Sequence, residues 1–93
     1  MVVGVLEVEL FIDGAQSLKE KRYVLRSLRD GLRQHFNVAV CETGEKDLWQ
    51  RATLGMAAVG EDRRVLNGVL DHVLDFIERR RDVRVISQKM DWV

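Results

Sequence analysis

The chain has 93 residues, of which 46% are hydrophobic and 32% charged, and its 15 basic and 15 acidic residues cancel to a net charge of zero. This length predicts one domain, residues 1–93, and the zero net charge disfavours nonspecific nucleic-acid binding by the whole surface. A single cysteine excludes an intramolecular disulfide and leaves no cysteine set for a metal cluster, so we expect no metal and no cofactor.

The N-terminal segment predicts a β-strand over residues 2–12. Its residues alternate, so that one face is formed by Leu6, Val8, Leu10 and Ile12. Glutamates interrupt the other face and no basic residues precede it, which disfavours a signal peptide or a membrane span. We therefore expect a cytoplasmic protein without membrane contact.

Residues 17–36 predict a long helix. Ser17 and Glu20 have the spacing of a capping box, in which each side chain bonds a backbone N–H of the other residue. One apolar arc recurs at helical spacing: Leu18, Leu25, Leu28, Leu32 and Phe36.

The second half of the chain predicts three strands and one helix. Residues 37–43 and 51–59 read as strands, with Leu54 and Met56 pointing inward, and a polar turn separates them. A helix follows Gly60-Glu61-Asp62, is closed by the arginines at 79–81, and precedes a strand over 83–93. Four acids of this region are expected to face solvent, away from the first helix: Asp71, Asp75, Glu78 and Asp82.

The resulting order, β-α-β-β-α-β, predicts an α+β, ferredoxin-like fold. In this fold a four-stranded antiparallel sheet carries both helices on one face, and the first and third strands are central. The other sheet face is left open. Glu7 and Glu9 are expected on that open face, where they would repel phosphates and disfavour RNA binding through the sheet.

A stripe of basic residues follows one flank of the first helix at alternating steps of three and four: Lys19, Arg22, Arg26, Arg29 and Arg33. Residues 17–36 hold six basic and two acidic residues, a local charge of +4 in a neutral chain. The stripe is either a solvated helix face, with arginine stems covering the core, or a set of contacts to RNA phosphates.

Trp49 and Arg51 lie at the connection between the second and third strands. Either Trp49 folds back to close one end of the core, or both residues form an anchor for a partner, since tryptophan and arginine are enriched at binding hot spots.

The sequence contains no recognisable catalytic constellation. Cys41 lies within a strand with no base beside it in sequence, which favours a small buried hydrophobe over a nucleophile. His35 and His72 lack a second ligand one helical turn away. We therefore expect a protein that is not an enzyme.

Three stretches of the chain resemble the YlxP-like family of small bacterial proteins, a domain of unknown function: SLKEKR at 17–22, FNV at 36–38 and DLWQRA at 47–52. The resemblance extends over essentially the whole chain. It implies a ferredoxin-like fold and, because family members' genes often lie among those for translation initiation and ribosome maturation, a role linked to RNA or the ribosome. It implies no catalytic residues. Gln16 and the GEK at 44–46 replace positions that often contain histidine in the family.

Two functional hypotheses follow. In the first, the protein is a non-enzymatic accessory protein that binds RNA or a ribosomal particle through the basic stripe, with a contribution from Trp49 and Arg51. In the second, it is an interaction module or homodimer that pairs through the open sheet face, with a patch formed by Val3, Val5, Phe11, Thr53, Gly55 and Ala57.

Overall fold

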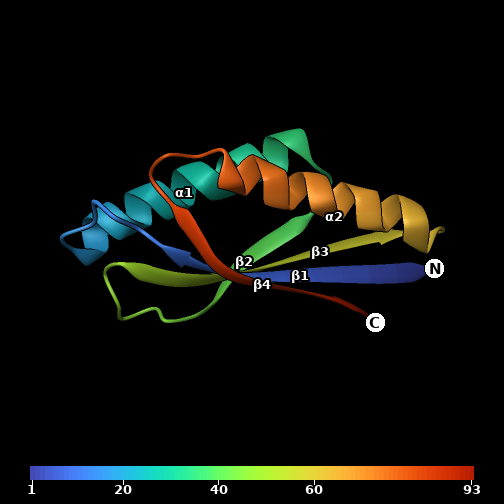
Figure 1. The fold of residues 1–93 in the computed structure, drawn as a ribbon, viewed down its shortest axis with the longest axis horizontal. Coiled ribbons are helices and arrows are strands. Elements are labelled where there is room, and N and C mark those ends of the chain that lie inside the picture. The colour runs from blue at the N-terminus through green and yellow to red at the C-terminus, as the bar shows by residue number, and fades with distance from the viewer.

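The computed structural model describes residues 1–93. Its elements are β1 (Val2–Phe11), α1 (Leu18–His35), β2 (Ala39–Gly44), β3 (Arg51–Gly60), α2 (Arg63–Glu78) and β4 (Arg84–Trp92). All neighbouring strands pair antiparallel in the order β2-β3-β1-β4, and both helices lie on one side of the sheet (Figure 1). The predicted ferredoxin-like α+β fold is confirmed, including the central position of the first and third strands.

The hydrophobic core lies between the sheet and the helices. Alternate residues of β1 and β3 point into it, and Leu54 and Met56 are buried as predicted. The helices bury one face each, which for α2 consists of Leu66, Leu70, Val73 and Ile77. Neither helix combines the length and the apolar character that a membrane crossing requires.

The start of α1 differs from the predicted capping box in one bond. Ser17 caps the helix, and its Oγ accepts a hydrogen bond from the backbone N–H of Glu20 at 3.2 Å. The Glu20 carboxylate accepts from the backbone N–H of Gln16 at 2.6 Å, one residue before the expected partner. The hydrogen bond from the Gln16 N–H to the Glu20 carboxylate therefore fixes the residue that precedes the cap.

Cys41 is exposed, so the prediction of a buried cysteine is wrong. β2 is an edge strand, and its neighbouring residue Val40 takes the position that faces the helices. Because successive side chains of a strand point to opposite faces, the Cys41 thiol lies on the open side of the sheet.

The end of α2 also differs from the prediction. The helix stops at Glu78, so Arg80 and Asp82 lie beyond it. Arg80 Nη2 binds Asp82 Oδ2 at 2.6 Å and contacts Ser27 Oγ of α1 at 3.3 Å. Asp82 was expected among the acids that point away from the first helix, and this is wrong because Arg80 bridges it to that helix. The other three acids of α2 are exposed as predicted.

Candidate functional site

The cationic flank of α1, which we define as Lys19, Arg22, Arg26, Arg29 and Arg33, lies on the side of the helix that borders the sheet edge. Arg33 Nη2 donates a hydrogen bond to the backbone carbonyl of Val40 in the edge strand β2, at 3.1 Å. On the other side of α1, Gly31 and His35 meet Phe76 of α2. The flank therefore lies on the side of α1 nearer β2 and not on the side that meets α2.

No residue of the cationic flank forms an ion pair with an acidic side chain. The structure contains five ion pairs, and none of them involves a residue of the flank. Four of its residues are exposed and Arg29 is half-buried. The acids nearby are otherwise engaged or unpaired: Glu20 bonds the start of the helix, Asp82 holds Arg80, and Asp30 makes no ion pair. The positive charge expected from the sequence is thus not tied up in ion pairs within the molecule.

Arg33 differs from the rest of the flank because it has a partner within the molecule. The Val40 carbonyl that it binds belongs to an edge strand, whose outer backbone groups have no neighbouring strand. A cation on such a group hinders the addition of a further strand. Four residues of the flank remain free for a ligand.

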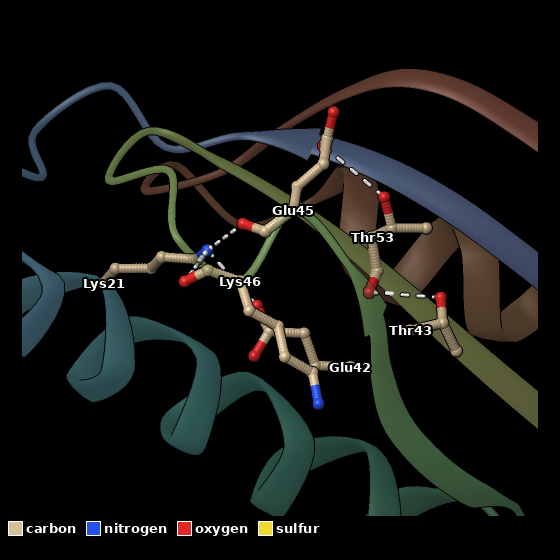
Figure 2. A network of polar contacts seen from close by, with 6 residues as sticks. All are labelled: Lys21, Glu42, Thr43, Glu45, Lys46 and Thr53. Carbon is tan, nitrogen blue, oxygen red and sulfur yellow. Dashed lines mark hydrogen bonds and ion pairs between the residues drawn. The ribbon is translucent and has the colours of Figure 1, made fainter.

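Lys21, adjacent to Arg22 in sequence, is only 2% exposed and is the residue that sequence reasoning missed. Its Nζ donates hydrogen bonds to the backbone carbonyls of Glu45 at 2.7 Å and Lys46 at 3.4 Å. Its Nζ also lies 3.2 Å from Glu42 Oε2, a buried atom without a hydrogen bond (Figure 2). The available signal was its position within the apolar arc, between Leu18 and Leu25 at helical spacing.

The ammonium of Lys21 secures the β2–β3 connection beneath the first turns of α1. Glu45, at the start of this connection, has the positive φ of 60° that a tight turn demands. Its carboxylate accepts a hydrogen bond from Thr53 Oγ1 at 3.4 Å (Figure 2). Burial, a hydrogen bond with Glu9 and the charge of Glu9 all raise the pKa of Glu45 above its ordinary value.

Trp49 and Arg51, the predicted partner-binding pair, lie at the end of this connection. Trp49 is 54% exposed and borders a hollow of about 830 Å³ together with Phe11 and Gln16. Arg51 Nη1 lies 3.5 Å from Glu9 Oε2, so its charge is compensated. The two residues thus share one hollow, in which only Trp49 offers a free aromatic surface.

The open sheet face carries charges of both signs, which corrects the expectation of an acidic face. Arg51 pairs with Glu9, and Lys89 of β4 lies opposite Glu7 in the register. A hollow of about 430 Å³ crosses this face and is lined mainly by small or apolar residues, among them Val5, Ala39, Cys41 and Ala57. No group of three or more His, Cys, Asp or Glu side chains is placed so that it could hold a metal ion.

The comparisons with known proteins agree with the resemblance seen in three sequence stretches. The chain matches the family described as "Protein of unknown function (DUF503)" over residues 3–90. It is 36% identical over 91 residues to the "Uncharacterized protein YlxP" of Bacillus subtilis (strain 168), and the match covers 98% of this chain and 99% of that protein. The chain therefore belongs to the DUF503 family, which includes YlxP-like proteins.

Proposed function

We propose that this protein is a non-enzymatic accessory protein that binds RNA, free or within a ribosomal particle, through phosphate contacts on the cationic flank of α1. The observation that carries the proposal is that no residue of the flank takes part in any of the five ion pairs of the structure. An arginine without an internal carboxylate partner is free to bind a phosphate through two parallel N–H···O bonds.

The flank extends along most of α1. Lys19 and Arg33 are separated by 14 residues of one uninterrupted helix, and a rise of about 1.5 Å per residue gives a length of roughly 21 Å. Arg33 is held by the β2 edge, so Lys19, Arg22, Arg26 and Arg29 are the contacts available. Four contacts predict that log affinity falls with log salt concentration at a slope of about −3 to −3.5.

The test is the affinity of the intact protein for a labelled RNA that contains both a stem and an unpaired loop. Affinity is measured between about 50 and 200 mM salt. The variant Arg22/Arg26/Arg29→Ala should lose about 100-fold in affinity, if each lost contact contributes roughly 1 kcal/mol. Its salt slope should fall to about −1.

A matched control removes the same number of arginines from the region of α2. The variant Arg64/Arg79/Arg81→Ala changes the net charge equally but leaves the flank intact. It should retain nearly all of the wild-type affinity. Equal losses in the two variants would mean that net charge alone governs binding, and an absence of binding by the wild type would contradict the proposal outright.

A second candidate function is self-association through the open sheet face. The hollow on this face is lined mainly by small or apolar residues, and Lys89 and Asp91 of β4 also line it. A twofold contact would set Lys89 of one copy against Asp91 of the other. The test is the mass in solution at high concentration, where Val5→Lys and Ala57→Lys should restore a monomer. A wild-type protein that stays monomeric throughout would exclude this function.

A further inference from the structure

One aromatic side chain on α1 has no role in the fold. Tyr23 is 77% exposed, and its hydroxyl makes no hydrogen bond within the structure. It is not among the residues that pack against the core. Tyrosine is also a poorer helix former than lysine or glutamate, so the helix itself does not require it. The residue therefore suggests a function at the surface.

The position of Tyr23 places it beside the cationic flank. It follows Lys19 by four residues and precedes Arg26 by three, and both spacings make side chains neighbours on one helix surface. Tyr23 also lies between two shallow hollows of about 660 and 520 Å³, and it is the single residue that lines both. Lys19 borders the first hollow and Arg26 borders the second. The side chain of Tyr23 thus borders open space in two directions, with one cation lining each hollow.

We infer that Tyr23 is a stacking platform for an unpaired base, and that the ligand of the flank is single-stranded RNA. This inference rests on the proposed function, because phosphate contacts by Lys19, Arg22 and Arg26 would bring the strand to the ring. Aromatic rings stack well on bases that are splayed out of a helix, whereas the bases of an A-form duplex are covered by their neighbours. A tyrosine within a row of cations therefore selects unpaired nucleotides over a duplex.

The chemistry of the second hollow supports a base rather than a bare phosphate. Ser27, Asp30 and Gln34 line it together with Arg26 and Arg80. Hydroxyl, carboxylate and amide groups can bond the polar edge of a base, and a carboxylate such as Asp30 would repel a phosphate. The phosphates are thus assigned to the cations, and the base to the ring and the hollow next to it.

The experiment compares binding of single-stranded RNA and of a fully paired duplex of equal length, with anisotropy as the readout. The wild type should prefer the single strand. Tyr23→Ala should lose roughly 5- to 150-fold in affinity for the single strand, the range for one stacked base. It should lose little for the duplex, and Tyr23→Phe should behave as the wild type. Trp49→Ala tests the other exposed aromatic. Val65→Ala, the control at an exposed apolar residue of α2, should leave the affinity for both RNAs unchanged.

The outcomes separate this inference from the proposed function. Equal affinity for the two RNAs, combined with an unaltered Tyr23→Ala variant, would overturn the stacking platform and leave phosphate binding by the flank in place. A loss in Trp49→Ala without a loss in Tyr23→Ala would also overturn it, by moving the base site to the β2–β3 connection. Failure of the wild type to bind either RNA would reject both. Because Tyr23 is exposed, its variants should unfold at the same urea concentration as the wild type.

Discussion

Two adjacent cationic residues of α1, Lys21 and Arg22, differ completely in their surroundings. Lys21 points into the protein, where two backbone carbonyls and Glu42 surround its ammonium within 3.4 Å. Arg22 opens toward solvent and has no partner. The position of a residue around the helix axis therefore decides the role of its charge. Arg22 faces solvent and is a candidate for ligand binding, whereas Lys21, one residue earlier, faces inward and stabilises the β2–β3 connection.

Cations on the open sheet face differ from those of the flank because acidic residues lie beside them at the surface. There Arg51 pairs with Glu9, and Lys89 lies opposite Glu7 across β1 and β4. Arg84 similarly pairs with Asp13 at 3.4 Å. A cation that already has a carboxylate beside it gains less from a phosphate, because the existing pair must first be broken. The flank of α1 is thus distinguished by its lack of ion pairs and not by its number of cations.

The largest effect on this comparison should come from Lys21→Met. The substitution leaves Glu42 Oε2 and two backbone carbonyls without their cation, so we expect the free energy of unfolding to fall by about 3 kcal/mol. Urea denaturation measures it. Arg22→Met, the control at the neighbouring residue, should change this free energy by less than about 0.5 kcal/mol. Similar losses of unfolding free energy in the two variants would contradict the comparison, because Arg22 would then stabilise the fold as much as Lys21 does.

Single substitutions in the flank should affect RNA binding and not stability. Arg22→Ala and Arg26→Ala should each lower the magnitude of the salt slope by about 0.7 to 0.9, as expected for one phosphate contact. Their unfolding midpoints should stay at the wild-type value. A salt slope that is unchanged in both variants would assign the phosphate contacts to other residues.

Arg33→Ala should affect stability more than RNA binding, because the Arg33 guanidinium already donates a hydrogen bond to the Val40 carbonyl. We expect the free energy of unfolding to fall by about 1 kcal/mol, the typical contribution of a partly exposed hydrogen bond. Its salt slope should change less than that of Arg26→Ala. If Arg33→Ala reduces RNA affinity as much as Arg26→Ala does without a loss of stability, then the bond to β2 is not maintained in solution.

The smallest effect should come from Asp82→Asn, which frees Arg80 beside α1. The hydrogen bond from Arg80 lowers the pKa of Asp82 below its ordinary value of 3.8, so this carboxylate stabilises the fold fully above pH 3.8. The stabilisation is lost as the pH falls through the lower, folded-state pKa. Because the pair is only partly shielded from solvent, we expect no more than about 0.5 kcal/mol.

Denaturation at neutral and acidic pH measures this contribution: the wild type should lose it on acidification, and Asp82→Asn should lack it throughout. The freed Arg80 should also extend the flank and raise RNA affinity by a few-fold at most. A decrease in affinity would mean that Arg80 and Asp82 contact the ligand as a pair.

Local patterns were sufficient to predict the elements and their order. Each prediction depends on residues that are close together in the sequence. This holds for the alternation in β1, the leucine spacing in α1 and the cap at Ser17. The stripe of the flank was predictable for the same reason, because its side chains are neighbours on one helix. Element ends differed by one or two residues, as is usual where helices and strands fray.

The roles of Lys21, Arg33 and Cys41 were decided only by the tertiary structure. Lys21 meets carbonyls 24 and 25 residues later in the chain, and Arg33 meets a strand across a turn. Cys41 is exposed because β2 lies at the sheet edge and Val40 takes the inner face. The β-α-β-β-α-β order and the row of cations could be predicted from the sequence, because both follow from patterns among residues close together in the chain. The sequence could not show which of these cations lack a partner within the protein. That depends on contacts between segments distant in the chain, which form only when the sheet is assembled.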